Sequence, residues 1–215
     1  MKIKGAIFDL DGTLLDSMPF WENLGSEYLK TKGIEPPKNI NKTLKTMSLD
    51  QSAEFLKREY SISGGKDEII KEIISLIENQ YRLKVPLKTG VMSFLERLYE
   101  KNVKMCSATA TDGELAKAAL DRLGAAKYFD FIFTCSEAGM GKNTPEFFLK
   151  VLELLKTPKH ETIVFEDALH AIKSAKAAGF FVVAVYDKSS CEDQEEIRAI
   201  ADVFLNSFED WEMIL

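Results

Sequence analysis

The fold of this chain is decided near its start by the stretch Ile3-Lys4-Gly5-Ala6-Ile7-Phe8-Asp9-Leu10-Asp11-Gly12-Thr13-Leu14. The first half of this stretch is a short apolar run typical of a buried strand, and Gly12-Thr13 predicts where that strand ends. Because strand side chains alternate, we expect Asp9 and Asp11 to project from the same side of the strand at its carboxyl end. Open α/β sheets bind their ligands at that edge.

The two aspartates, Asp9 and Asp11, indicate a particular chemistry. Neighbouring carboxylates repel each other and raise each other's pKa unless a cation lies between them. The pair therefore predicts a divalent-metal site, and an aspartate beside such a metal can attack phosphorus. The alternative is an acidic surface turn, which any Asp-x-Asp-Gly sequence can form.

Length and composition place the chain among ordinary soluble globular proteins. Its 215 residues, 46% of them hydrophobic and 29% charged, are enough for one domain with an insert. The net charge of -6, without any basic block, argues against a nucleic-acid-binding surface. The apolar start is interrupted by Asp9 and Asp11, which predicts no signal peptide, and no apolar run reaches membrane-spanning length. We therefore expect a cytoplasmic monomer with no nucleic-acid or membrane partner.

After Gly90 the hydrophobic pattern alternates between short apolar runs and amphipathic segments. The pattern predicts strands at 103–108, 131–135, 162–165, 180–186 and 203–205, and helices at 91–101, 112–123, 145–156, 168–178, 192–200 and 208–214. Because the strands are continuously apolar and separated by helices, they predict an α/β fold with a Rossmann-like parallel sheet that helices cover on both faces.

The segment 17–86 breaks this rhythm, because it has helical periodicity and no convincing strand. It leaves the sheet directly after the aspartate loop and returns just before Gly90. We therefore predict a catalytic core at 1–16 and 87–215 and an inserted helical domain at 17–86, placed beside the chemistry as expected of a lid.

Three further strand ends carry polar residues suited to phosphate chemistry. Thr109 and Thr111 form a hydroxyl cluster at the start of a helix, where backbone N–H groups favour an anion. Lys142 follows two glycines in a loop, and Glu166-Asp167 follows a strand that should be buried. Taken singly, these features are also explained as helix caps, a solvated lysine and an acidic pair that begins a helix.

Taken together, the residues at successive strand ends converge on one edge of a parallel sheet. In such a set the carboxylates hold Mg²⁺, while threonine and lysine hold the phosphoryl oxygens and spread the charge of the transition state. The set consists of Asp9, Asp11, Thr109, Lys142 and the pair Glu166-Asp167.

These segments resemble the four motifs of the haloacid dehalogenase (HAD) superfamily, the first motif being Asp9-Leu10-Asp11-Gly12-Thr13-Leu14-Leu15-Asp16-Ser17. The helical insert after the first motif is similar to the cap of the C1-capped branch, which contains β-phosphoglucomutase and related sugar-phosphate phosphatases. The resemblance extends over essentially the whole chain. It implies a Rossmann-like core with an inserted all-helical C1 cap.

The resemblance also implies roles for the two aspartates of the first motif. Asp9 would be the nucleophile that forms an aspartyl-phosphate, and it would also be a ligand of Mg²⁺. Asp11 would be the general acid toward the leaving alkoxide and then the general base for water, with its backbone carbonyl on the metal.

The other motifs receive their roles in the same way. The resemblance implies that Thr109 and Lys142 bind phosphate and that Lys142 offsets the charge of Asp9. Asp167 would be a metal ligand, with Glu166 in or just outside the coordination sphere. The lysine motif departs from the usual pattern at Asn143, where relatives usually have proline, but this change concerns loop rigidity rather than a catalytic group.

Two positions of the insert bear on the substrate. The segment Asp16-Ser17-Met18-Pro19-Phe20-Trp21 resembles sugar-phosphate phosphatases, and β-phosphoglucomutase has a histidine where Trp21 aligns and an arginine near Leu49. Trp21 and Leu49 are therefore candidate substrate residues, although Trp21 is equally explained as part of the core of the cap. Both are apolar, although cations such as Lys42, Lys45, Arg58 and Arg82 remain available elsewhere in the insert.

The sequence thus favours a Mg²⁺-dependent phosphatase acting on a small phosphorylated metabolite, such as a sugar or polyol phosphate. A phosphomutase of the β-phosphoglucomutase type is the first alternative, because it uses the same aspartyl-phosphate to rephosphorylate its substrate. A receiver-like phosphoacceptor domain is a remote alternative. It would carry its acceptor on a later strand and need no lid, so Asp9, Asp11 and the insert argue against it. A dehalogenase would lack the second aspartate.

Overall fold

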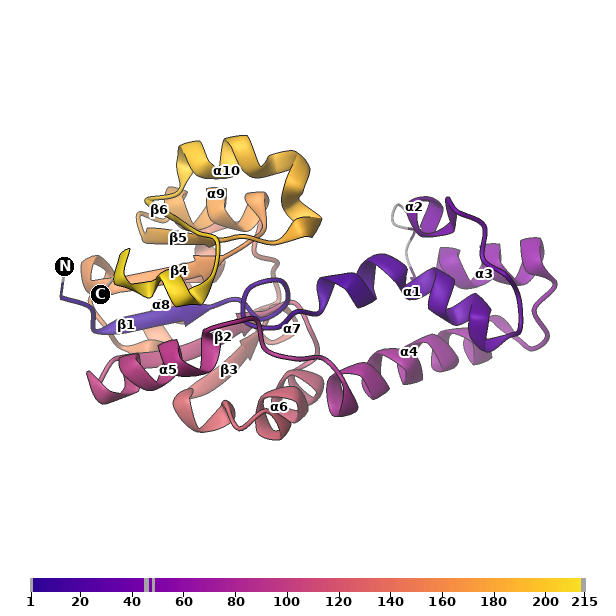
Figure 1. Cartoon of the computed structure of the whole chain (residues 1–215), viewed down its shortest axis with the longest axis horizontal. Coiled ribbons are helices and arrows are strands. Elements are labelled where there is room, and N and C mark those ends of the chain that lie inside the picture. The colour runs from indigo at the N-terminus through magenta and orange to yellow at the C-terminus, as the bar shows by residue number, and fades with distance from the viewer. Residues whose placement is uncertain (1, 45–46, 48, 214–215) are drawn as a thin grey trace. The chain divides into compact units, whose positions relative to one another are not determined.

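The computed structural model describes residues 2–44, 47 and 49–213. Lys45, one of the expected cations of the insert, lies outside the described residues. The chain divides into two compact units. The core unit comprises Met1–Met18 and Val85–Leu215, and the helical unit comprises Pro19–Lys84 (Figure 1).

Parallel strands form the centre of the core unit. In the described part of the chain, six strands form one sheet in the order β3-β2-β1-β4-β5-β6. Every pair of neighbours is parallel. The strands are β1 (Gly5–Phe8), β2 (Lys104–Thr109), β3 (Phe131–Thr134), β4 (Thr162–Glu166), β5 (Phe181–Val185) and β6 (Val203–Leu205). The predicted Rossmann-like parallel sheet is confirmed, with the aspartate strand β1 in its middle.

Helices cover both faces of this sheet (Figure 1). They are α5 (Val91–Glu100), α6 (Gly113–Arg122), α7 (Cys135–Ala138), α8 (Pro145–Leu155), α9 (Leu169–Ala177) and α10 (Gln194–Ile200). On one face Ile7 and Val164 belong to a core that also contains side chains of α8, α9 and α10. On the other face Phe8 stacks on Phe165 with 4.4 Å between ring centroids, and Phe94 of α5 meets Phe8 edge-on. Alternate residues of each strand thus enter opposite layers.

Short 3₁₀ helices complete the core unit, and they account for two differences from the predicted elements. They are η1 (Ala126–Tyr128), η2 (Lys159–Glu161), η3 (Lys188–Asp193) and η4 (Phe208–Met213). The helix expected at 192–200 is divided, because η3 ends at Asp193 and α10 begins at Gln194. The helix expected at 208–214 is the 3₁₀ helix η4, which has a non-helical residue at Asp210.

The strand expected at 131–135 ends one residue early, because Cys135 begins α7. The Thr134 hydroxyl accepts a hydrogen bond from the Glu137 N–H at 3.1 Å, and the Glu137 carboxylate accepts one from the Thr134 N–H at 2.8 Å. This reciprocal pair is a capping box, and its Thr-x-x-Glu signature is present in the sequence.

The helical unit has its own apolar core. Its helices are α1 (Met18–Thr31), α2 (Ile40–Leu44), α3 (Leu49–Tyr60) and α4 (Lys66–Leu83), and no strand occurs among its described residues. The core is formed by Tyr28, Leu29, Ile40, Ala53, Leu56, Ile62, Ile69 and Ile73. Across the described residues of both units, none of the helices combines the length and apolar character that crossing a membrane requires.

The chain leaves the core unit and returns to it through two segments that pair with each other. Leu15 and Leu87 form an antiparallel bridge, and the Asp16 N–H donates to the Pro86 carbonyl at 3.0 Å. The Lys88 N–H donates to the Leu14 carbonyl at 2.9 Å. These bonds hold the start and the end of the helical insert against the loop that follows β1.

Candidate active site

Most predicted site residues of the core unit lie at the carboxyl ends of β1, β2 and β4, and Lys142 lies in the loop between α7 and α8. Asp9 follows β1 directly, and its N–H donates to the Phe165 carbonyl of β4 at 2.9 Å. Thr109 is the last residue of β2 and Glu166 the last residue of β4. The central position of β1 therefore places Asp9 between the ends of its two neighbouring strands.

Three buried carboxylates form the negative part of this site. Asp9, Glu166 and Asp167 each offer an oxygen within 4.8 Å of the others, and their exposed fractions are 7%, 1% and 4%. Burial raises the pKa of Asp167 well above its ordinary value, and the neighbouring charges of Glu166 and Asp9 add to the rise. Burial also raises the pKa of Asp9 to about 7, although Lys142 opposes this shift. Such a cluster of oxygen ligands fits a hard divalent cation, which would relieve the repulsion.

Lys142 contributes the positive charge of the site. Its ammonium group donates to Asp9 Oδ1 and, at 2.8 Å, to Glu166 Oε1. The side chain is buried, which by itself would lower the pKa of the ammonium group, but Asp9 and Glu166 raise that pKa above its usual range. The other oxygen of Glu166 accepts backbone N–H groups from Asp167 at 2.9 Å and Ala168 at 3.0 Å. Lys142 is therefore a cation fixed beside Asp9, not the solvated loop lysine that was the alternative.

The carboxylate of Asp11 is held by two hydroxyl groups. Ser17 donates to its Oδ1 at 2.7 Å, and Thr111 donates to its Oδ2 at 2.6 Å. The Thr111 N–H in turn donates to the Thr109 hydroxyl at 3.0 Å. Neither threonine caps α6, because Asp112 accepts the free N–H groups at the start of that helix. Thr111 and Ser17 thus contact Asp11 directly, and Ser17 is a partner of Asp11 that pattern reasoning did not assign.

The turn after β1 makes a close approach to Asp167. Gly12 has a φ of +82°, and a Cβ atom at this position would lie 2.5 Å from Asp167 Oδ2. The next residue, Thr13, donates from its hydroxyl to Asp167 Oδ1 at 3.0 Å. Glycine is needed here both for the positive φ and for the space. The Gly-Thr pair thus does more than end the strand, because it also orients the carboxylate of Asp167, the residue that follows β4.

The two candidate substrate residues, Trp21 and Leu49, belong to the helical unit. Trp21 lies on α1, and its indole N–H donates to the Tyr81 hydroxyl of α4 at 2.9 Å, with the two rings edge-on. Leu49 is the first residue of α3 and is 37% exposed. Trp21 is thus fixed by a partner within its own unit, while Leu49 presents apolar surface.

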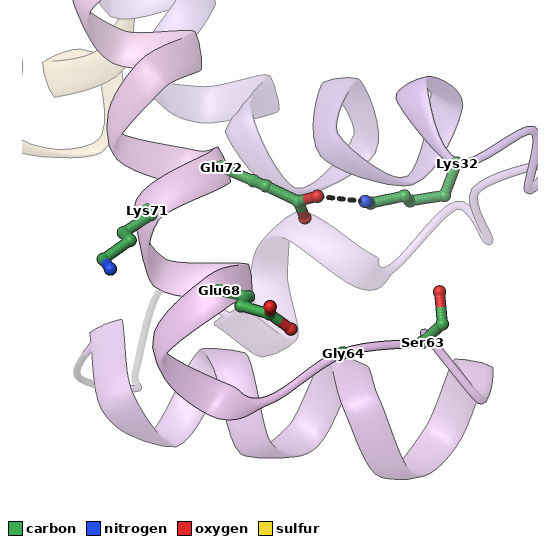
Figure 2. A pocket seen from close by; sticks show the side chains of 6 residues that line it. All are labelled: Lys32, Ser63, Gly64, Glu68, Lys71 and Glu72. Atoms are coloured by element: carbon green, nitrogen blue, oxygen red, sulfur yellow. Dashed lines mark hydrogen bonds and ion pairs between the residues drawn. The ribbon is translucent and has the colours of Figure 1, made fainter.

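The helical unit also contains a hollow of about 420 Å³, which is lined by Lys32, Ser63, Gly64, Glu68, Lys71 and Glu72 (Figure 2). Lys32 and Glu72 form an ion pair of 2.6 Å across it. Figure 2 shows the Lys71 side chain pointing away from that pair. None of the lining residues belongs to the predicted site.

Comparison with known proteins identifies the family of the chain. Residues 6–185 match the family model of haloacid dehalogenase-like hydrolases. The chain belongs to this family. A phosphorylated carbohydrates phosphatase of Thermotoga maritima is 26% identical over 177 residues, which cover 82% of each chain. A glyceraldehyde 3-phosphate phosphatase of Methanocaldococcus jannaschii is 30% identical over 97% of this chain and 95% of its own.

A solved structure gives the same fold for this HAD hydrolase. A Thermotoga maritima protein provisionally named a β-phosphoglucomutase superimposes with a TM-score of 0.86 and 23% identity, covering 99% of this chain and 100% of its own. This likeness concerns the fold, while the match of residues 6–185 to the family model confirms the recognised family and the assignment of the chain as an enzyme of the hydrolase class.

Proposed function

We propose that this HAD hydrolase is a Mg²⁺-dependent phosphatase that hydrolyses a small phosphorylated metabolite, a sugar or polyol phosphate, through an aspartyl-phosphate on Asp9. The observation that carries the proposal is the buried Lys142 ammonium group paired with Asp9 beside Asp167 at the carboxyl edge of the sheet. The names of two relatives, a phosphatase of phosphorylated carbohydrates and a triose-phosphate phosphatase, support the same substrate class.

The donor set fits Mg²⁺ because it consists of oxygen atoms and carries enough negative charge to bind a hard cation. We assign Asp9, Asp167 and the backbone carbonyl of Asp11 as the groups that would hold the ion. Glu166 completes the buried cluster, and its contacts with Lys142 and two backbone N–H groups orient it. When bound, Mg²⁺ supplies charge neutralisation for the phosphoryl oxygens.

In the first step a carboxylate oxygen of Asp9 attacks phosphorus, and the bond from phosphorus to the ester oxygen breaks. Asp11 donates a proton to the leaving alkoxide. Lys142 and the Thr109 hydroxyl hold the phosphoryl oxygens as charge spreads over them. In the second step Asp11 takes a proton from water, the water oxygen bonds to phosphorus, and the carboxylate of Asp9 is released with inorganic phosphate.

Ser17 and Thr111 support the role proposed for Asp11. Each donates to a different oxygen of the carboxylate, so the side chain has a defined orientation in the free protein. The two hydroxyl groups therefore hold the carboxylate in place for the proton transfers proposed for it.

We further propose that the helical insert at 17–86 acts as the lid over a catalytic core at 1–16 and 87–215, with Trp21 and Leu49 as substrate-contacting residues. Hydrolysis is favoured over mutase chemistry because both positions are apolar. Of the four cations of the insert named from the sequence, three are described: Arg58 is paired with Glu59 at 2.7 Å, and Lys42 and Arg82 are exposed. A mutase needs a cation aimed at the second phosphate of a bisphosphorylated intermediate.

The test is a panel of sugar phosphates, polyol phosphates and nucleotides assayed with Mg²⁺ for both phosphate and organic product. We expect inorganic phosphate to appear in equal amount with the dephosphorylated product. Isomerisation of a sugar phosphate without phosphate release, stimulated by the corresponding bisphosphate, would show a mutase instead. Absence of turnover across the whole panel would refute the phosphatase assignment.

A further inference from the structure

A lysine outside the family motifs contacts the loop that follows β1 and carries Asp9 and Asp11. Lys88 is located where the chain returns from the helical insert, and its ammonium group has three protein acceptors, all in the core unit. These are the Gly12 carbonyl at 2.6 Å, the Tyr186 carbonyl at 2.5 Å and Asp187 Oδ2 at 2.9 Å. Because an ammonium group has three N–H donors, the three contacts use all of them.

We propose that Lys88 is a positioning residue for the loop that carries Asp9 and Asp11, and that Asp187 anchors it. This inference rests on the proposed function, because it concerns the same site. Lys88 has no N–H left for a phosphate oxygen, so its effect passes through the Gly12 carbonyl rather than through contact with substrate.

Asp187 is suited to hold the Lys88 ammonium group in place. Its side chain is buried, and its second oxygen accepts the N–H of Ser189 at 2.9 Å and the Ser189 hydroxyl at 2.7 Å. Burial alone would raise the pKa of Asp187, but the hydrogen bonds from Lys88 and Ser189 hold it below its usual range. Asp187 is therefore ionised at neutral pH, and it pairs with Lys88 where little solvent reaches.

The contact of Lys88 with the loop after β1 affects the proposed catalytic carboxylates through two neighbouring residues, Gly12 and Thr13. The carbonyl that Lys88 binds belongs to Gly12, which directly follows Asp11 and packs against Asp167. Thr13, the next residue, donates to Asp167. A shift of the Gly12 peptide would therefore displace the Asp11 backbone and the Asp167 contact together.

The backbone of Lys88 is itself fixed to the same loop. Its N–H donates to the Leu14 carbonyl, and the adjacent Leu87 bridges to Leu15. The backbone of Lys88 is thus held at a defined position relative to the loop after β1, and the ammonium group extends from that position. Partners that orient metal ligands are worth about 10–100-fold in metal affinity or activity when removed, and we expect an effect in this range.

The experiment compares Lys88→Met with Lys176→Met. Lys176 is a matched control because it also pairs with an aspartate, Asp202, at 2.6 Å, and Asp202 likewise accepts a backbone N–H, that of Val182. Activity toward p-nitrophenyl phosphate, Mg²⁺ affinity by isothermal titration calorimetry and thermal unfolding are measured for both variants.

For Lys88→Met we expect kcat to fall about 10–100-fold with KM within about twofold, and Mg²⁺ to bind about tenfold or more weakly. For Lys176→Met we expect lowered thermal stability but wild-type kcat and Mg²⁺ affinity. The proposal is overturned if Lys88→Met keeps wild-type kcat and Mg²⁺ affinity, or if Lys176→Met loses as much of both.

A second variant covers the case in which Lys88→Met does not fold. Asp187→Asn leaves the two carbonyl contacts of Lys88 in place and removes only the ionic anchor, so we expect a smaller loss of kcat in the same direction. Wild-type kcat and Mg²⁺ affinity in a folded Asp187→Asn variant would contradict the proposal. If the wild-type protein hydrolyses no phosphate ester, the proposed function fails, while the Mg²⁺ titrations of the variants still test the positioning role.

Discussion

Thr13 donates a hydrogen bond of 3.0 Å to Asp167, and both side chains are buried. This bond joins the turn after β1 to the residue after β4, which lies 154 positions further along the chain. It means that the turn carrying the proposed nucleophile and the far carboxylate are held in one arrangement before any ligand binds. Such preorganisation lowers the cost of ordering the site during the reaction.

Substitution of Gly12 tests this arrangement. In Gly12→Ala the new Cβ would meet Asp167 Oδ2 at 2.5 Å, so we expect Mg²⁺ affinity and kcat to fall about 10–100-fold. The matched control is Gly124→Ala, because Gly124 has a φ of +72° but no atom within 4 Å of its Cβ position. Both variants carry the backbone strain, and only the first displaces Asp167. Equal activity in the two variants would contradict the role given to the close approach.

Removal of the Asp9 charge should abolish turnover. An amide is a poor nucleophile and a weaker metal ligand, so we expect Asp9→Asn to retain less than about a hundredth of wild-type kcat, a barrier increase of roughly 3 kcal/mol or more. Chelation with EDTA should also stop the reaction, and added Mg²⁺ should restore it in wild type only. Asp202→Asn, at an ion pair away from the site, is the control for the substitution. Activity of Asp9→Asn above that limit would exclude Asp9 as the nucleophile.

The acid role of Asp11 is tested with two substrates. p-Nitrophenolate leaves without protonation, whereas an alkoxide needs a proton, so Asp11→Asn should reduce the hydrolysis of an alkyl phosphate far more than that of p-nitrophenyl phosphate. Mg²⁺ affinity should fall less than in Asp9→Asn, because the proposed ligand from Asp11 is its backbone carbonyl. Equal losses toward both substrates would count against general acid catalysis by Asp11.

The buried ion pair of Asp187 predicts a pH dependence of stability. The pKa of Asp187 is lowered in the folded protein, so its contribution is present above the unfolded value of 3.8 and is lost as the pH falls through the folded pKa. Asp187→Asn should lower the free energy of unfolding by about 1–3 kcal/mol at pH 7. In urea unfolding at a series of pH values, the difference from wild type should shrink below about pH 4. A difference that stays constant down to acid pH would show that the ionised form of Asp187 is not what stabilises the fold.

Trp21 offers a test of the cap as the source of selectivity. Trp21→Ala should change the ratio of rates among sugar and polyol phosphates more than the rate toward p-nitrophenyl phosphate. Trp21→Phe keeps an aromatic ring but removes the hydrogen bond to Tyr81, and it is the control for the packing contribution. A uniform loss of activity in Trp21→Ala, matched by a loss of thermal stability, would assign Trp21 to the packing of the helical unit.

The parallel sheet and the meeting of Asp9, Lys142 and Glu166-Asp167 at one edge were predictable from local patterns. Apolar runs define buried strands, and the carboxyl ends of parallel strands necessarily share an edge. The catalytic roles given to these residues remain predictions. The beginning of α7 was missed although its Thr134-Cys-Ser-Glu137 signature was present, because the apolar run favoured a longer strand.

The partners of Lys88 could not have been predicted. Its acceptors Gly12 and Asp187 are separated from it by 76 and 99 positions. Contacts of that kind follow from tertiary packing and leave no periodic signal in a single sequence. The hydrogen bonds of Ser17 and Thr111 to Asp11 depend in the same way on how two loops meet.

The pairing of Leu15 with Leu87, and of Asp16 with Pro86, has a consequence for how such an enzyme changes over time. The two segments that connect the units pair with each other within the core unit. Residues 19–84 therefore form an insertion whose two ends are held together by the core unit. The entropic cost of closing a loop grows only slowly with its length. The insertion can therefore become longer or shorter, or be replaced, with little effect on the stability of the sheet. If the insert selects the substrate as proposed, a change of substrate can arise within residues 19–84, while the sheet edge that carries the aspartates stays the same.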